Sequence, residues 1–333
     1  MKAKKINKNI LITGAGSLIG QGVIKIVRKY SSNHKIIGAD YVNKTIGLHW
    51  CDKSYYLPDI LDKNIKKQKW INSIIKIIKK EKIDMVIPCA DFEIKLYSEF
   101  KETLKKKFNV EIIVSDYNLV ESCNDKFKTV QLLKKHNLDF PKSCLPNKKF
   151  FNGKISFPLI VKPRIGSTSK NVYLVKNMEQ LKNAIKNCQS PIIQEYLKGD
   201  EYTCGVIFLK NKLISVICLR RQLKNGNTSI AFLEKNLILD NYISNVAKIF
   251  KPYGPMNFQL KLTKRGPIIF EINPRFSGTT PVREKFGLNE YEAIIRTLFT
   301  NKNFSYKLNE GVVIKYLAES YLNFKKFKDI KYL

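Results

Sequence analysis

Several polar residues near the C-terminal end of the chain have the types and the spacing of a cation site. The segment NFQLKLTKRGPIIFEIN, residues 257–273, places two alternating runs around a Lys-Arg-Gly turn and predicts a β-hairpin with its loop at 264–266. The register then predicts two cross-strand pairs on one face, Gln259 with Glu271 and Asn257 with Asn273. One carboxylate among amide oxygens suits Mg²⁺, which keeps waters and shares phosphate oxygens with a substrate. The alternative is an ordinary solvated hairpin face.

The opposite face of the same hairpin is apolar. Alternation along the two strands predicts that this face packs on a core through Phe258, Leu260, Leu262, Ile268, Phe270 and Ile272. The cation site is therefore expected on a sheet that has one buried face.

A loop of small residues further upstream could bind a phosphate. FPLIVKPRIGSTSKNVYLV, residues 157–175, has the pattern of strand, loop and strand, with Lys162 and Arg164 at the mouth of the loop. Backbone N–H groups of such a loop can close over an anion that the two cations neutralise, and the loop residues are Gly166, Ser167, Thr168 and Ser169. The Walker A pattern is absent. The alternative for Lys162 is a surface lysine at a strand end.

The next segment could hold a nucleoside. PIIQEYLKGDEYTCGVIFL, residues 191–209, predicts a strand, a Lys-Gly-Asp turn and a second strand, with Glu195 and Glu201 on either side of the turn. Glu195 can accept a hydrogen bond from an adenine amino group, and Glu201 can accept from ribose hydroxyls. Upstream, SCNDKFKTVQLLKKHNLDFPKS predicts a helix that is capped by Asn124 or Asp125.

The first part of the chain alternates apolar strands with amphipathic helices and predicts a doubly wound parallel sheet. Gly14, Gly16 and Gly20 form GxGxxxG, and Asp40 ends the next strand, where a dinucleotide-binding fold would hold a ribose. This spacing is one residue away from GxGxxG, and no YxxxK pair lies in a plausible helix. The glycines can equally serve the close approach of a helix to a neighbouring loop. An NAD(P)-binding oxidoreductase or epimerase is therefore an alternative function.

The composition allows more than one kind of partner. The chain has 333 residues and a formal charge of +32, which suits a nucleic-acid-binding protein, and this is a second alternative. However, only eight of the 60 basic residues are Arg, the lysines are scattered, and no recognition helix, zinc finger or aromatic RNA-binding motif accompanies them. The seven cysteines form no CxxC pair, no signal-peptide cleavage site is evident, and no uncharged run reaches the length of a membrane span. We expect a cytoplasmic protein that binds neither nucleic acid nor membrane.

The order of the features along the chain resembles the ATP-grasp superfamily, most closely its branch that is similar to the large subunit of carbamoyl phosphate synthase. The features are a lysine at a helix start, V-K-P, the small-residue loop, Q-E-Y, and Q…E-x-N-P-R on a hairpin. The resemblance implies a fold of class α/β and α+β. A doubly wound parallel pre-ATP-grasp domain at 1–117 would precede a two-lobed ATP-grasp module of mainly antiparallel sheets, with lobes at 118–190 and 191–305 and a tail at 306–333.

The resemblance also implies ATP and Mg²⁺ as cofactors and assigns their contacts. The residues implied for the ATP phosphates are Lys126, Lys162, Arg164, Ser167, Thr168 and Ser169. The residues implied for adenine are Glu195, Tyr196 and Leu197, with Glu201 for the ribose. The implied ligands of Mg²⁺ are Gln259, Glu271 and Asn273.

The implied activity is the ADP-forming ligation of a small-molecule carboxylate to an amine or amino acid, in the biosynthesis of surface sugars or peptide-like metabolites. A carboxylate oxygen would attack the γ-phosphorus of ATP, and the amine would then attack the acyl phosphate. The catalytic residues expected are Lys162, Arg221 and Arg275. Substrate contacts are expected from Asp91, Glu93, Arg220, Arg221 and Arg283. The tail predicts a strand followed by a homodimer contact or a covering helix.

Overall fold

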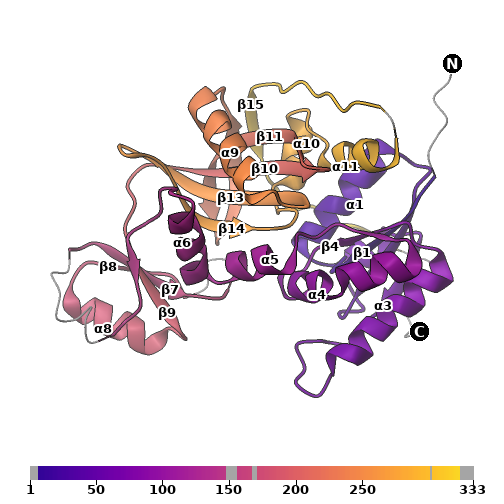
Figure 1. Cartoon of the computed structure of the whole chain (residues 1–333), viewed down its shortest axis with the longest axis horizontal. Coiled ribbons are helices and arrows are strands. Elements are labelled where there is room, and N and C mark those ends of the chain that lie inside the picture. The colour runs from indigo at the N-terminus through magenta and orange to yellow at the C-terminus, as the bar shows by residue number, and fades with distance from the viewer. Residues whose placement is uncertain (1–6, 148–155, 167–170, 301, 323–333) are drawn as a thin grey trace.

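The structure is a computed structural model that describes residues 7–147, 156–166, 171–300 and 302–322. Figure 1 shows three sheets joined by helices, with the smallest sheet projecting at the left of the view. The predicted fold class is confirmed, because the first sheet is parallel and the two that follow are antiparallel. The boundaries expected at residues 117, 190 and 305 stay predictions.

The first sheet has five parallel strands in the order β3-β2-β1-β4-β5. They are β1 (Asn9–Thr13), β2 (Lys35–Asp40), β3 (Lys53–Tyr56), β4 (Met85–Pro88) and β5 (Glu111–Ile112). The connecting helices are α1 (Leu18–Tyr30), α2 (Ile46–His49), α3 (Lys67–Glu81) and α4 (Asp91–Phe108). The strand order reverses between β1 and β4, as a doubly wound sheet requires. Because all five strands are parallel, their carboxyl ends lie at the same edge of the sheet.

The smallest sheet has four antiparallel strands in the order β6-β9-β7-β8. They are β6 (Ser143–Cys144), β7 (Leu159–Pro163), β8 (Tyr173–Val175) and β9 (Pro191–Glu195), and α8 (Met178–Asn187) packs on them. Its core consists of side chains from this sheet and α8, centred on Val161, Leu181 and Ile193.

The largest sheet has six antiparallel strands in the order β14-β13-β10-β11-β12-β15. The strands are β10 (Asp200–Leu209), β11 (Lys212–Lys224), β12 (Asn227–Leu233), β13 (Gly254–Thr263), β14 (Gly266–Asn273) and β15 (Gly311–Ile314). The remaining helices are α5 (Tyr117–Asn124), α6 (Lys126–Lys135), α9 (Leu237–Phe250), α10 (Thr280–Lys285) and α11 (Glu290–Phe299). β15 supplies the strand predicted for the tail, residues 315–322 form no helix, and residues 323–333 lie outside the described part of the chain.

One core joins the first sheet to the largest sheet. Side chains of β1 and α1 pack with Ile207 and Leu209 of β10, and with Phe276 and Ile294. α1 also lies close to α10, where the Cα of Gly22 faces the ring of Pro281 with no room for a Cβ. These two sheets therefore form one packed unit, and the smallest sheet is attached to it.

No helix in the described part of the chain is both long enough and apolar enough to cross a membrane.

Candidate active site

The β13–β14 hairpin brings Gln259 opposite Glu271 and Asn257 opposite Asn273, as predicted. The predicted three-residue loop is wrong, because Thr263 pairs with Gly266 and the loop has only two residues. A β-bulge corrects the register: Leu260 pairs with Ile269, and Phe270 is the extra residue before Glu271.

The bulge changes which face Phe270 occupies. Phe270 was expected in the core, but its side chain lines a cavity on the polar face, and the fully buried Ile269 contributes to the core instead. A bulge re-aims side chains in this way because two residues of one strand then oppose a single residue of its partner.

The polar end of the hairpin is centred on the Glu271 carboxylate. Glu271 Oε1 accepts hydrogen bonds from Gln259 Nε2 at 3.3 Å and from Asn273 Nδ2 at 3.0 Å. The oxygens of the two amides accept from Arg221 and Arg275 and belong to the same cluster, so one carboxylate and two amide oxygens form a donor set that fits a Mg²⁺ ion that keeps several waters. Asn257 does not share this role, because it is buried and bonds Thr203 and Arg283 instead.

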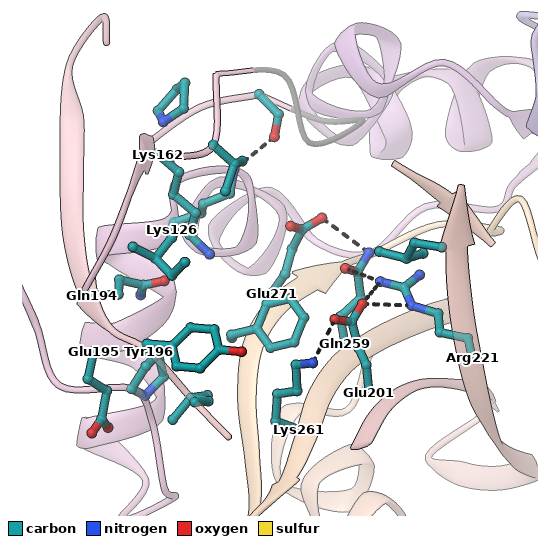
Figure 2. A pocket seen from close by; sticks show the side chains of 18 residues that line it. Lys126, Lys162, Gln194, Glu195, Tyr196, Glu201, Arg221, Gln259, Lys261 and Glu271 are labelled. Carbon is teal, nitrogen blue, oxygen red and sulfur yellow. Dashed lines mark hydrogen bonds and ion pairs between the residues drawn. The ribbon is translucent and has the colours of Figure 1, made fainter. Parts of the chain in front are cut away.

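A cavity of about 300 Å³ lies between the smallest sheet and the hairpin. Figure 2 shows that Lys126 and Lys162 enter it from one side, while Glu201, Arg221, Gln259 and Glu271 line the other. The site residues predicted from β7, β9, β10 and β13 are thus collected around this cavity together with Glu271 of β14, whereas Asn273 lines the adjoining cavity. Its apolar lining includes Ile160, Val172, Leu197, Leu223 and Phe270.

Two lysines give this cavity a positive wall. Lys126 is the first residue of α6, where Asp125 is the N-cap, as predicted; its Nζ donates to the Gly166 carbonyl at 2.8 Å. Lys162 extends from β7, and its ammonium lies 5.3 Å from the centre of the Phe270 ring.

Burial lowers the pKa of Lys162 to about 8; Glu271 and Glu201 oppose this shift and the charge of Lys126 adds to it. Among the described residues neither lysine has an ion-pair partner, so an anionic ligand would relieve their repulsion.

Arg164 does not face the cavity, contrary to its expected phosphate contact. Its guanidinium makes an ion pair with Asp125, with Nη2 2.5 Å from Oδ2, and its backbone carbonyl accepts from the Lys126 N–H. Arg164 therefore ties the strand end to the start of α6. The other expected phosphate contacts, Ser167, Thr168 and Ser169, lie outside the described residues.

The segment predicted to hold adenine forms another part of the wall of this cavity. Glu195, Tyr196 and Leu197 all line it, but the Glu195 carboxylate is already engaged. It accepts from the Lys142 N–H at 2.9 Å and pairs with Arg265 at 2.6 Å. These bonds leave the backbone after Glu195 as the better candidate for reading the adenine edge.

A charged network lies beside this segment. Arg221 donates to Glu201 at 2.7 Å and to Gln259 Oε1 at 2.8 Å, and Lys261 makes a second ion pair with Glu201 at 3.3 Å. Arg221 is expected to contact the substrate, but it lines this cavity and donates a hydrogen bond to Gln259 instead. Lys261 was missed, although it is two residues after Gln259 on the same strand face, a signal that the sequence contained. Gln194 was missed as well, because its place among the apolar residues of a strand favoured a core position.

Three other expected substrate residues line neither this cavity nor the adjoining one that is described next. Arg220 points to the other face of β11, where it stacks on Phe232 and pairs with Glu234, because successive side chains alternate along a strand. Arg283 is fully buried in an ion pair with Glu290 at 2.6 Å. Glu93 is buried beneath the first sheet, where it accepts from Thr13 Oγ1 at 2.7 Å.

A second cavity, of about 340 Å³, adjoins the first. The two share Lys126, Gly166 and Glu271. Asp91, which begins α4, and Arg275, which follows β14, meet there in an ion pair that links the first sheet to the hairpin. A cavity therefore lies between the first sheet and the hairpin, and its use as a substrate pocket stays a prediction.

The glycine turn after β1 is closely packed. The Cα of Gly16 faces Thr45 and that of Gly20 faces the carbonyl of Gly14, so a Cβ at either position would overlap its neighbour. Asp40, which a dinucleotide fold would use for a ribose, accepts instead from the Gly16 N–H at 2.7 Å. The glycines thus allow close packing within the turn, and the oxidoreductase alternative gains no support.

Comparison with known proteins places these features in a family. An ATP-grasp domain model matches residues 123–279, and a PylC-like N-terminal domain model matches residues 10–113. The D-alanine–D-alanine ligase of Fusobacterium nucleatum is 36% identical over 83 residues, which cover 25% of this chain and 28% of that protein. The carbamoyl phosphate synthase large chain of Clostridium acetobutylicum is 24% identical over 93% of this chain and 30% of its own length. This chain therefore spans less than a third of the length of either relative.

The fold comparison agrees. The biotin carboxylase domain dimer of the Hydrogenobacter thermophilus 2-oxoglutarate carboxylase, solved with MgADP, ADP and bicarbonate, superposes with a TM-score of 0.69. It is 14% identical, and the match covers 92% of this chain and 73% of that one. The resemblance inferred from the order of motifs is confirmed, because an ATP-grasp domain spans residues 123–279 of this chain.

Proposed function

We propose that this protein is an ATP-dependent, ADP-forming carboxylate–amine ligase. The observation that carries the proposal is the cavity between the smallest sheet and the hairpin, where Lys126 and Lys162 face the Glu271 carboxylate. Two cations opposite a carboxylate with flanking amides suit a polyphosphate that shares a Mg²⁺ ion with the protein. The same cavity has an apolar end near Leu197, which suits a base.

Each part of the nucleotide has a candidate contact in this proposal. The base lies against the backbone from Glu195 to Leu197, the ribose lies near Glu201, and the phosphates extend toward Lys126 and Lys162. Gln259, Glu271 and Asn273 would hold Mg²⁺, which when bound neutralises phosphate charge. Arg221 has a positioning role, because it fixes both Glu201 and Gln259.

The two cavities meet at Lys126, Gly166 and Glu271, so a substrate in the second cavity would lie beside the phosphates of a nucleotide in the first. A substrate carboxylate in the second cavity attacks the γ-phosphorus, the bond to the β-phosphate oxygen breaks, and ADP leaves. Lys162 and Arg275 stabilise the negative charge on the transferred phosphoryl group. An amine then attacks the acyl carbon and displaces phosphate, forming the amide.

Thermal stability in the presence of Mg²⁺ and a non-hydrolysable ATP analogue tests the proposal. A ligand that binds only the folded state raises the melting temperature by mass action. We expect stabilisation of the wild-type protein by the analogue, little effect of NADH or NADPH, and loss of the Mg²⁺-dependent part in Glu271→Gln. Glu99→Gln is the matched control, because Glu99 pairs with Lys67 outside the cavity. Stabilisation by a nicotinamide cofactor alone would contradict the proposal.

A further inference from the structure

The second cavity has walls from four parts of the chain. The start of α4 contributes Asp91, Phe92 and Lys95, and the end of α5 contributes Val120 and Cys123. The hairpin contributes Glu271 to Arg275, and Ile165 and Gly166 close the side next to the nucleotide cavity. A molecule in this cavity would therefore touch the residues that face the γ-phosphate.

The charged groups of this cavity are arranged as a pair of opposite sign. Arg275 is 9% exposed, and three acceptors hold its guanidinium: the Asp91 carboxylate, the Phe276 carbonyl at 2.9 Å and Asn273 Oδ1 at 3.2 Å. The Asp91 side chain is 42% exposed, so a ligand can reach it. A fixed cation beside an accessible anion complements a molecule that carries a carboxylate and an ammonium group close together.

The remaining charged side chains place the carboxylate end of such a molecule. Lys126 and Glu271 lie at the wall shared with the nucleotide cavity, and Lys95 pairs with Glu121 at 3.4 Å. A carboxylate between Arg275 and Lys126 thus approaches the γ-phosphate, whereas an ammonium group beside Asp91 lies further from it.

Most of the remaining wall of the cavity is apolar, and Asn124 and Asn273 are its polar members. Its described walls include Phe92, Ile94, Val120, Ile165, Ile272 and Pro274. Phe92 is itself supported by an edge-to-face contact with Tyr41, whose ring centre lies 5.4 Å away. A hydrophobic side chain gains free energy by leaving water for such a wall, and a charged one does not.

We infer that the second cavity binds an α-amino acid with an apolar side chain, and that this amino acid is the acid activated by ATP. Arg275 and Lys126 bind its carboxylate, Asp91 binds its ammonium group, and Phe92 contacts its side chain. One carboxylate oxygen bonds to the γ-phosphorus as ADP leaves. The inference rests on the proposed ligase function and names the substrate class of that site.

Hydroxylamine in place of the unidentified amine tests the inference. Its nitrogen displaces phosphate from the aminoacyl phosphate and leaves a hydroxamate, which is measured together with ADP. The acids compared are leucine, phenylalanine, glutamate, and the two counterparts without an amino group, isocaproate and hydrocinnamate. The variants are Asp91→Asn and the control Glu99→Gln, which changes a carboxylate on the same helix outside both cavities.

We expect hydroxamate from leucine or phenylalanine at a KM at least about tenfold below that of the corresponding acid without the amino group. Asp91→Asn should raise the KM for the amino acid about tenfold more than the KM for isocaproate, because loss of the ion pair with Arg275 affects both acids and loss of the ammonium contact affects only the amino acid. Equal use of both kinds of acid, a preference for glutamate, or an unchanged KM in Asp91→Asn overturns the inference.

Failure of the inference is distinguishable from failure of the proposed function. If the ATP analogue stabilises both the wild type and Asp91→Asn but no amino acid yields hydroxamate, the inferred substrate class is wrong and the nucleotide site stands. If the analogue stabilises neither, the proposed function falls and the inference falls with it.

Discussion

Gln259 lies directly opposite Glu271 because the bulge at Phe270 compensates for a loop that is one residue shorter than the pattern predicts. The bulge also directs two consecutive side chains, Phe270 and Glu271, into the same cavity. The proposed cation ligand and the apolar wall of the proposed nucleotide cavity therefore depend on one irregularity of one strand.

Phe270→Ala should weaken nucleotide binding with little loss of stability. The ring contacts the Lys162 ammonium and lines the cavity, and such a contact is worth about 0.5–2 kcal/mol. Ile269→Ala should instead lower the free energy of unfolding by about 2–5 kcal/mol, because Ile269 is fully buried. Urea unfolding and calorimetric titration with the ATP analogue measure the two effects. A larger stability loss in Phe270→Ala than in Ile269→Ala would contradict this assignment of faces.

Lys162→Met should stabilise the ligand-free protein at neutral pH by about 1–3 kcal/mol, because burial disfavours the charged ammonium. The same change should abolish stabilisation by the ATP analogue. The pKa of Lys162 is lower in the folded protein than in the unfolded chain. Between pH about 8 and the ordinary pKa of lysine, the unfolded chain therefore binds more protons than the folded protein, and the stability of the wild type should rise as the pH rises through this interval. Lys162→Met should lack that rise. Urea unfolding at pH 7 and at higher pH tests both statements.

Binding of the ATP analogue should weaken as the pH rises through about 8. Above that pH, Lys162 loses its proton in the ligand-free protein, and binding must then take up a proton. Lys162→Arg keeps its charge throughout this range and should show a flatter pH profile. Equal slopes for the wild type and Lys162→Arg would show that Lys162 does not contact the phosphates.

Glu93→Gln should remove a pH dependence of stability. Burial raises the pKa of the Glu93 carboxyl to about 8, and its contact with Thr13 only partly offsets the shift. The folded state therefore holds a proton that the unfolded chain releases above its ordinary pKa, and wild-type stability should fall as the pH rises from that value to about 8. The variant should match the wild type in mild acid and exceed it at pH 8. Thermal unfolding at the two pH values measures the difference.

Arg283→Met should lower the free energy of unfolding by about 3–5 kcal/mol, because it leaves Glu290 buried without its partner. Arg220→Met should cost no more than about 1 kcal/mol, since its pair with Glu234 is near the surface. Both variants should retain the nucleotide affinity of the folded protein. A selective loss of analogue binding in either would restore its expected role in the site.

Most of the fold could be predicted because the strands are apolar, and because amphipathic helices separate them in the first sheet and a short turn separates them in the β13–β14 hairpin. The cross-strand pairs at Glu271 and Asn273 and the capping of α6 by Asp125 also followed from local patterns. α5 was missed, since its eight residues have only a weak apolar periodicity.

The destinations of the arginines could not be predicted. Arg220 and Arg221 are adjacent in sequence, and only the register of β11 decides that one faces Glu201 and the other Glu234. Arg283 and Glu93 depend on packing between elements that are distant in the chain, which no local pattern records. Phe270 was misplaced because alternation assumes a regular strand, and a bulge breaks that assumption.

The first and the largest sheet share one core, and the smallest sheet has another, so selection can alter the choice of acid independently of the use of ATP. The side chains proposed to recognise the acid are carried mainly by α4 and β14, within that shared unit, whereas Lys162 and the segment proposed to hold adenine belong to the smallest sheet, which has a core of its own. Substitutions at positions such as Phe92 can therefore change the choice of acid without disturbing the packing beneath the nucleotide. Such an architecture allows descendants of one ancestral chain to diversify their substrates while the use of ATP stays constant.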